Sequence, residues 1–449
     1  MTPIRVFLVD DSSVVRRLVS DALTGDPEVM VVGTAPNGKT ALARFPQVHP
    51  DLIVMDVEMP EMDGLQTLSA IRKLDRHLPV IMFSTETRRG AAATLDALAL
   101  GASDYVTKPV NSGGTQKAIE YVRNELLPKI KALCAPRYEE RSRAGLSGER
   151  SGIALPPERP STTPLSGDQF PGLSERVATP EKTRHPVAVP PREPTVAPRP
   201  GHQQSRVVTN RPGTAATDPT LTASHSWPPL PARVSNPIPK PVKERRWPAK
   251  AVEVVVVGVS TGGPAALGEF LPALPATLPV PVLIVLHMPP MFTRLLAERL
   301  AESCSLPVHE AVDGEPVRAG HVYLAPGGYH MVLQRDSTPR IVLNQDAPEN
   351  HCRPAVDVLF RSVVKAYGAA TLAIVLTGMG QDGKNGCELI RAAGGQVVVQ
   401  DQASSVVWGM PGAIARGGLA DEVLPLSQIP SAVTRRLPAT SALAPTRLL

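Results

Sequence analysis

The stretch IRVFLVDDS, from Ile4 to Ser12, opens with an apolar run and closes with two aspartates and a serine. Amphipathic stretches such as SVVRRLVSDAL separate it from four further apolar runs: VMVVGTA (29–35), LIVMD (52–56), PVIMFS (79–84) and DYVTK (104–108). Nearly continuous Val, Ile and Leu residues are typical of strands that are buried on both faces of a parallel sheet. The pattern therefore predicts an α/β fold, with five β/α units in a doubly wound, flavodoxin-like domain.

Polar side chains stand where these predicted strands end. Asp10 and Asp11 follow the first run, and Asp56, Ser84 and Lys108 end the third, fourth and fifth. Because the carboxyl ends of parallel strands meet at one edge of a sheet, we expect all of them in one crevice. Adjacent carboxylates repel each other unless a cation joins them, and oxygen ligands of this kind suit Mg²⁺.

A single strand-end aspartate could merely cap the helix that follows it. Five suitable residues on four of the five strand ends instead predict an aspartyl-phosphate site, with Asp56 as the nucleophile and Asp10, Asp11 and Asp56 as Mg²⁺ ligands. The ammonium of Lys108 and the metal would stabilise the phosphoryl oxygens.

The motifs VDDS, LIVMDVEMPEMDGL and YVTKP, with a serine at the fourth strand, resemble the receiver domain of bacterial response regulators. The resemblance covers residues 1–127. It implies phosphorylation of Asp56 by a histidine kinase and a phosphoryl switch made by Ser84, Tyr105 and Lys108. It also implies a cis peptide bond between Lys108 and Pro109.

Proline is concentrated in one part of the chain. Residues 136–249 hold 22 of the 49 prolines, and they carry 17 Lys and Arg against 10 Asp and Glu. This composition predicts a disordered basic linker, because proline fixes φ and removes a backbone donor; a docking motif for a partner is the alternative. The stretch has a net charge of +7 and the whole chain only +5, so the positive charge does not indicate a folded nucleic-acid-binding face.

The sequence also bears on location. The four cysteines form no C-x-x-C pair, which favours isolated thiols in a reducing cytosol. The apolar run before Asp10 is too short for a signal peptide, and no stretch approaches the roughly 18 apolar residues that span a bilayer. We therefore expect a soluble, cytoplasmic protein that does not insert into a membrane.

A second α/β domain with a mostly parallel sheet is predicted over residues 250–436. Its main strands are expected in AVEVVVVGV (251–259), VPVLIVLHM (280–288) and TLAIVLTGM (371–379), with a β excursion between the second and third. The first strand leads into a G-x-S-x-G motif centred on Ser260, whose glycines allow a sharp turn that exposes the serine hydroxyl. By chance such a motif is often only a glycine-rich helix entry.

Two other strand ends strengthen the prediction. His287 terminates the second strand and Asp382 follows the third, so both should reach the same sheet edge as Ser260. We interpret them as a catalytic triad in which His287 deprotonates Ser260 and Asp382 orients the imidazolium. The competing residues in this domain are His309, His321, His330, His351, Asp357 and Asp401. Asp357 lies inside a helical pattern and is expected to be a surface or helix-pairing residue.

The motifs GVSTGGP, LHMPPMFT, LAPGGYHM, RPAVDVLF, LTGMGQDG and VVWGMPGAIA resemble the catalytic domain of the chemotaxis receptor methylesterase family, CheB. The resemblance implies hydrolysis of glutamyl methyl esters on chemoreceptors and deamidation of receptor glutamines, without a cofactor at the hydrolase site. It also places the backbone N–H of Met379 in the oxyanion hole.

Two other functions compete with this one. A DNA-binding output domain would need a helix-turn-helix and a basic folded face, and the α/β pattern of residues 250–436 offers neither. A scaffold with a dead serine site is disfavoured by the complete triad.

Overall fold

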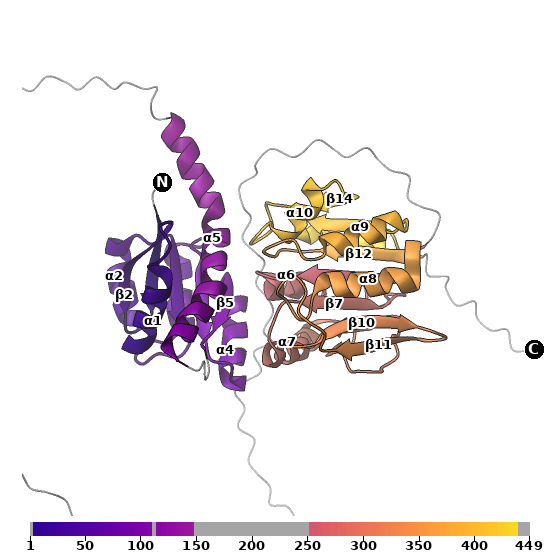
Figure 1. Cartoon of the computed structure of the whole chain (residues 1–449), viewed down its shortest axis with the longest axis horizontal. Helices are drawn as coiled ribbons and strands as arrows, with labels where there is room; N and C mark the ends of the chain where they lie inside the picture. The colour runs from indigo at the N-terminus through magenta and orange to yellow at the C-terminus, as the bar shows by residue number, and fades with distance from the viewer. Residues whose placement is uncertain (1–2, 110–113, 148–250, 439–449) are drawn as a thin grey trace, which may run out of the picture. The chain divides into compact units, whose positions relative to one another are not determined.

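The computed structural model describes residues 3–109, 114–147 and 251–438. Its strands form two large sheets and one hairpin (Figure 1). None of the helices in these ranges is both long enough and apolar enough to cross a membrane.

The first sheet has five parallel strands in the order β2-β1-β3-β4-β5. The strands are β1 (Ile4–Val9), β2 (Val29–Ala35), β3 (Leu52–Asp56), β4 (Val80–Ser84) and β5 (Asp104–Thr107). All residues of β3 and β4 are buried, as expected for the centre of a sheet that is covered on both faces. The predicted doubly wound domain is confirmed, with strand ends within one residue of those expected.

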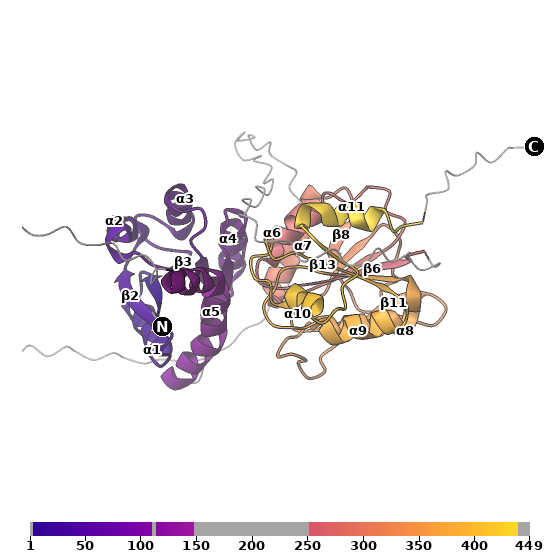
Figure 2. The same cartoon turned by 90° about the horizontal axis from the view of Figure 1, so that it is seen from above.

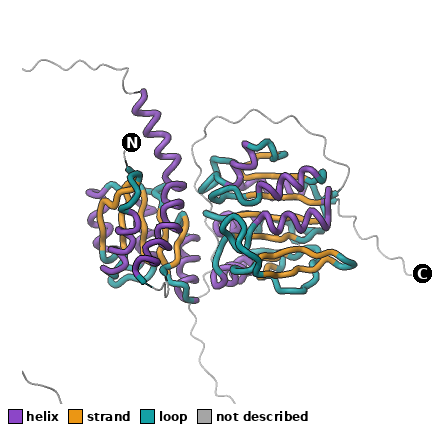
Figure 3. The backbone as a smooth tube through the Cα atoms, viewed as in Figure 1, coloured by secondary structure: helices purple, strands orange, loops and turns teal. Residues whose placement is uncertain are grey.

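Helices cover both faces of this sheet (Figure 3). They are α1 (Ser13–Leu23), α2 (Gly38–Val48), α3 (Gly64–Leu74), α4 (Arg88–Ala99) and α5 (Thr115–Ser147). Helices α1 and α5 pack on one face, where Leu23 and Val122 join Leu8 in the core. On the other face, Leu68 of α3 and Leu95 of α4 pack with residues of β1 and β3.

Helix α5 differs from the sequence-based expectation. It continues beyond Ala135 to Ser147, so the linker predicted to begin at residue 136 is helical in its first part. Residues 137–147 contain no proline, so the composition on which the linker prediction rests does not apply to them. The rest of the predicted linker lies outside the described residues.

The second sheet has seven parallel strands in the order β14-β13-β12-β6-β7-β9-β8. They are β6 (Val254–Val259), β7 (Val282–Leu286), β8 (Val308–Glu310), β9 (Val322–Leu324), β12 (Thr371–Val375), β13 (Gln396–Gln400) and β14 (Glu422–Leu424). The predicted β excursion is the antiparallel hairpin of β10 (His330–Arg335) and β11 (Pro339–Asn344). Strands β12, β6 and β7 are adjacent, so their carboxyl ends lie together at the centre of one edge.

Six α-helices and two short 3₁₀ turns complete this part of the chain within the described residues. They are α6 (Gly263–Phe270), α7 (Pro290–Ser303), α8 (Val356–Tyr367), η2 (Gly368–Ala370), α9 (Lys384–Ala392), α10 (Met410–Arg416), η3 (Leu426–Gln428) and α11 (Ile429–Thr434). Figure 2 shows α6, α7 and α11 on one side of the sheet and α8, α9 and α10 on the other. The alternate residues of β6 divide accordingly, with Val255 and Val257 facing one layer and Val254 and Val256 the other.

Candidate functional site

Three carboxylates meet at the carboxyl edge of the first sheet. Asp10 and Asp11 follow β1 and Asp56 ends β3, and one oxygen of each lies within 4.8 Å of the other two. Asp10 and Asp56 are buried, whereas Asp11 is exposed. The predicted convergence of these residues is confirmed. A cluster of hard oxygen ligands that opens to solvent on one side is typical of a Mg²⁺ site.

Lys108 joins two of these carboxylates. Its Nζ lies 2.8 Å from Oδ2 of Asp10 and 2.7 Å from Oδ2 of Asp56. Burial raises the pKa of Asp56 to about 6, although the Lys108 ammonium acts in the opposite direction. Burial alone would lower the pKa of Lys108, but its bonds to the two carboxylates raise it above its usual value. The site is thus a desolvated carboxylate beside a fixed ammonium, which is what a phosphoryl acceptor needs.

The other two residues predicted for this site lie on neighbouring strands. Ser84 ends β4, and its hydroxyl donates to the carbonyl of Gly90 at 3.1 Å, toward helix α4. Tyr105 lies in β5, where it pairs with Met82 of β4. The expectation of a cis Lys108–Pro109 bond is wrong: within the described residues, the cis bond is Arg353–Pro354.

The second candidate site begins with the turn that carries Ser260. Strand β6 ends at Val259 and helix α6 begins at Gly263, so only three residues connect them. Gly262 has a φ of +78°, and a Cβ there would lie 2.6 Å from Val406 Cγ2, so the position requires glycine. The turn is closed by a hydrogen bond of 2.7 Å from Gly263 N–H to the Ser260 carbonyl. The predicted sharp strand-to-helix turn is confirmed.

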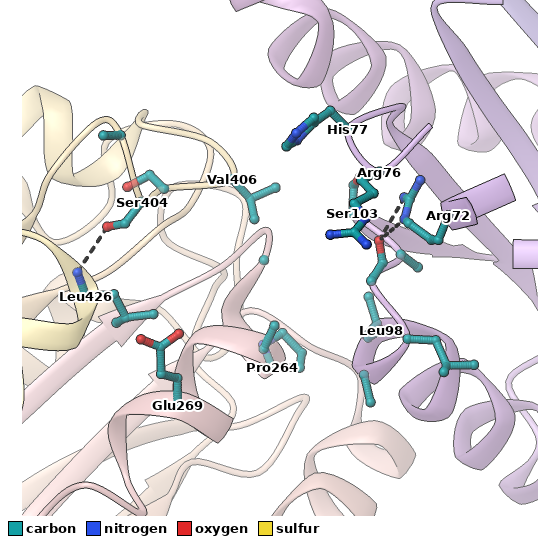
Figure 4. Close-up of a pocket in the computed structure, with 18 of the residues that line it drawn as sticks. Arg72, Arg76, His77, Leu98, Ser103, Pro264, Glu269, Ser404, Val406 and Leu426 are labelled. Carbon is teal, nitrogen blue, oxygen red and sulfur yellow. Dashed lines mark hydrogen bonds between the residues drawn. The ribbon is translucent and has the colours of Figure 1, made fainter. Parts of the chain in front are cut away.

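Buried hydrogen bonds support this turn from the β12 side. Ser260 N–H donates to the Thr377 carbonyl at 3.0 Å, and the Thr377 hydroxyl donates to the Thr261 carbonyl at 2.9 Å. Gln400 accepts from Thr377 N–H and donates to the Ser404 carbonyl. Ser404 Oγ in turn accepts from Leu426 N–H at 3.0 Å (Figure 4). The position of Ser260 is therefore fixed by a network that reaches across three strand ends.

Ser260 and His287 end adjacent strands. Val259 pairs with Leu286, and His287 N–H donates to the Val259 carbonyl at 3.3 Å, so the two residues are the next pair along the sheet. Their side chains share no hydrogen bond within the described residues. Catalytic hydrogen bonds are often loose in a free enzyme and tighten when substrate binds, so this geometry is compatible with proton transfer.

His287 and Asp382 are in direct contact. His287 Nε2 lies 2.8 Å from Asp382 Oδ2, although the residues are 95 positions apart. Burial alone would lower the pKa of His287, but its bonds to Asp382 and to the Cys352 thiol raise it to about 9. Because Nε2 faces the carboxylate, Nδ1 is the ring nitrogen left for proton transfer.

Asp382 is a buried carboxylate with several donors. Its Oδ2 accepts from Val356 N–H at 2.7 Å, and its Oδ1 accepts from the N–H groups of Asp357 and Gly383 at 3.0 and 2.9 Å. Burial would raise its pKa, but His287 and these backbone donors lower it below its usual value. Two of the donors belong to the first turn of α8, where the helix dipole also favours negative charge.

Met379 lies in a tight loop beside Ser260. A Cβ on the preceding Gly378 would lie 2.9 Å from Ser260 Cβ and 2.5 Å from Met410 Sδ. The Gly378 N–H donates to Val407 and its carbonyl accepts from Gly409 and Met410. Within the described residues the Met379 N–H donates no hydrogen bond, so it is available to donate to a ligand.

The competing histidines either have other partners or are exposed. His330 is buried with both ring nitrogens engaged, one by Ala355 N–H and the other near the Ala347 carbonyl. His309 pairs with Glu315 at 3.0 Å, His321 lies against the Tyr323 ring, and His351 is exposed. Among the histidines of this part of the chain that the structure describes, His287 is the one bonded to Asp382.

Asp357 was expected to be a surface or helix-pairing residue; it is not at the surface, but it does join helix α8 to helix α9. It is 1% exposed, accepts from Gly386 N–H at 2.7 Å, and lies beside Asp382. Burial raises its pKa. Asn350, which sequence reasoning missed, donates to both carboxylates. For Asp357 the sequence did offer a signal, because it is an aspartate in the first turn of a helix that follows a proline. Nothing in the sequence marks Asn350. Asp401, the other competing aspartate, accepts from Ser404 N–H and Oγ within its own turn.

Comparisons with known proteins identify a family for each part of the chain. The model of the response regulator receiver domain matches residues 6–120, and the model of the CheB methylesterase matches residues 255–433. A protein-glutamate methylesterase/protein-glutamine glutaminase of Trichodesmium erythraeum is 43% identical over 97% of this chain and 100% of its own length. A protein of the same description from a Nocardioides species is 44% identical over 97% of this chain and 96% of its own length.

Solved structures match each part separately. The catalytic domain of the Thermotoga maritima CheB methylesterase is 41% identical, with a TM-score of 0.41, and the match covers 41% of this chain and 99% of that one. The response regulator domain of Thermotoga maritima CheB is 40% identical, with a TM-score of 0.26, and covers 29% of this chain and 94% of that one.

Proposed function

Because this chain belongs to the CheB family of protein-glutamate methylesterase/protein-glutamine glutaminases, we propose that it is a serine hydrolase that demethylates chemoreceptors under the control of phosphorylation at Asp56. The substrates are glutamyl γ-methyl esters and glutamine side chains of the receptors, and the process is chemotactic adaptation. The observation that carries the proposal is the contact of 2.8 Å between His287 Nε2 and Asp382 Oδ2, at the strand end next to Ser260.

The first half of the reaction forms a glutamyl-enzyme. Ser260 Oγ attacks the ester carbonyl while Nδ1 of His287 takes its proton. The free N–H of Met379 donates to the oxyanion, and the N-terminal turn of α6 adds favourable partial charge. His287 then gives its proton to the departing methoxide, and methanol leaves. Asp382 stabilises the imidazolium through Nε2.

The second half releases the product. Water attacks the glutamyl-Ser260 ester, His287 takes the proton of that water, and the same proton returns to Ser260 Oγ as the carboxylate leaves. A glutamine side chain follows the same course, with ammonia in place of methanol. No step of this scheme requires a metal or a cofactor at Ser260.

The receiver part supplies the control. Asp56 accepts a phosphoryl group from a histidine kinase, and Lys108 holds a phosphoryl oxygen in place of its present contact with Asp56. Mg²⁺ would bind Asp10, Asp11 and Asp56, whose oxygens are within 4.8 Å, and would neutralise the phosphoryl charge. Ser84 and Tyr105 rearrange with the phosphoryl group. Kinase and receptor sites are reached from the cytoplasm, so we place the protein there.

The alternatives receive less support. A DNA-binding output domain does not fit residues 255–433, which match a methylesterase. A scaffold with a dead serine site does not explain a buried His287–Asp382 pair beside a free N–H donor.

Release of methanol from methylated receptor membranes tests the proposal. Wild-type protein should release methanol, and Ser260→Ala should release none above background.

A further inference from the structure

Two carboxylates lie together beneath the candidate active site. Asp357 and Asp382 are only 1% and 3% exposed, and the backbone N–H of Asp357 donates to Oδ1 of Asp382 at 3.0 Å. Two buried like charges repel each other unless donors stand between them. Three backbone N–H groups donate to these carboxylates: those of Val356 and Gly383 to Asp382, and that of Gly386 to Asp357.

The side chain of Asn350 bridges the pair. Its Nδ2 lies 2.7 Å from Asp382 Oδ1 and 3.1 Å from Asp357 Oδ2. A carboxamide nitrogen carries two hydrogens and no negative charge, so one group can donate to both oxygens. Asn350 itself is exposed, so its amide forms the solvent side of a buried charged cluster.

The turn that carries Asn350 is held to helix α8. Glu349 and Cys352 exchange backbone hydrogen bonds of 3.1 and 2.9 Å, and Glu349 makes two contacts of 2.5 and 2.6 Å with Arg361 of α8. Asn350 has a φ of +52°, which asparagine tolerates better than most residues. Cys352 of the same turn is also one of the groups that raise the pKa of His287.

We propose that Asn350 is a positioning residue for the hydrolase: its amide fixes the carboxylate of Asp382, so that Oδ2 stays directed at His287. The inference rests on the proposed function, because it takes His287 and Asp382 as the catalytic pair. Asn350 acts on turnover through Asp382, and its loss should reduce kcat with little change in KM.

Two variants distinguish the effect of the Asn350 side-chain amide from the effect of its backbone conformation. Asn350→Gly keeps the positive φ without strain and removes only the side chain. Asn350→Asp keeps the size and the backbone preference but replaces the donor with a carboxyl group. The Asn350 amide contacts Asp357 and Asp382 directly. The titratable and charged groups of its surroundings are Glu349, His351 and Cys352 on its own turn, Arg361 and His330, which act on Glu349, and His287, which is bonded to Asp382. Beside two carboxylates the pKa of the new carboxyl should rise, and only its protonated form can donate to Asp382.

The test measures kcat and KM for hydrolysis of p-nitrophenyl acetate by the full chain, together with thermal unfolding. We expect a loss of roughly 10- to 100-fold in kcat for Asn350→Gly, the range found when a residue that orients a ligand of a metal centre is removed. For Asn350→Asp we expect a deficit relative to wild type that grows as pH rises from about 5 to 8, because its carboxyl loses its proton. Asn344→Gly is the matched control, since its side chain accepts from Asp346 N–H on the same segment.

Folded Asn350→Gly protein with kcat within twofold of wild type would overturn the inference. An Asn350→Asp deficit that does not change with pH would also overturn it, and this variant decides the matter if Asn350→Gly does not fold. Ser260→Ala distinguishes a failure of the proposed function. If Ser260→Ala keeps wild-type esterase activity, the hydrolase assignment itself is wrong, whatever the Asn350 variants do.

Discussion

His287 Nε2 lies 2.8 Å from Oδ2 of Asp382, and this contact joins the ends of two strands that are separated by β6 in the sheet. The contact orients the imidazole so that Nδ1 is left for proton transfer. It also favours the protonated form of the ring. Burial alone would lower the pKa of His287, yet Asp382 and Cys352 raise it to about 9.

The wild-type rate should rise with pH. His287 must be neutral to take a proton from Ser260, and with a raised pKa it is mostly protonated at pH 7. We expect kcat/KM to increase about tenfold per pH unit well below pH 9 and to level off above it. A pH profile of ester hydrolysis checks this. A plateau that is already complete at pH 7 would show that the base titrates at its ordinary value.

Asp382→Asn should slow hydrolysis and move that profile. The substitution removes the charge that stabilises the imidazolium, so the pKa of His287 should fall and the rising limb should shift to lower pH. The loss in kcat should be on the order of 10³- to 10⁴-fold at neutral pH, as expected for the orienting carboxylate of a triad. An unshifted profile in the residual activity would contradict the assignment of Asp382.

Gly378→Ala should reduce kcat. The added Cβ would lie 2.9 Å from Ser260 Cβ and 2.5 Å from Met410 Sδ, so the loop or the nucleophile must move. Displacement of a reacting group by about 1 Å can cost on the order of 100-fold in rate. Gly417→Ala is the control, because Gly417 has a φ of −73° and its added Cβ would approach Ala413 O at 3.2 Å. Equal rates for the two folded variants would contradict a tight approach at Ser260.

Asp56→Asn should abolish activation by acetyl phosphate and leave basal turnover unchanged. Asparagine keeps the shape of aspartate but is too weak a nucleophile to accept a phosphoryl group. It also removes one charge from the acidic cluster, so Mg²⁺ affinity should fall. A tenfold activation of the wild type corresponds to about 1.4 kcal/mol. Equal stimulation of both proteins by acetyl phosphate and Mg²⁺ would show that control does not pass through Asp56.

Sequence patterns predicted the residues at the strand ends well, but they did not predict the residues that contact Asp382 from other elements. Asp10, Asp56 and His287 could be placed because near-continuous apolar runs mark buried parallel strands, whose carboxyl ends must share an edge. Asn350 could not be placed, because it contacts Asp382 from a turn 32 residues away and lies in no periodic pattern. For Asp357 the sequence left a surface and a helix-pairing role open, because its first-turn position in α8 suits an exposed residue as well as a buried one, and the structure shows the second.

Methanol release from methylated receptor membranes tests the central claim most directly, since it reports the proposed bond cleavage on the proposed substrate. Wild type, Ser260→Ala and Asp56→Asn should be compared, each with and without acetyl phosphate and Mg²⁺. We predict faster release by phosphorylated wild type, unstimulated basal release by Asp56→Asn, and a loss on the order of 10⁶-fold for Ser260→Ala. A Ser260→Ala protein that keeps more than about a tenth of wild-type release would contradict the account, because a triad without its nucleophile retains far less.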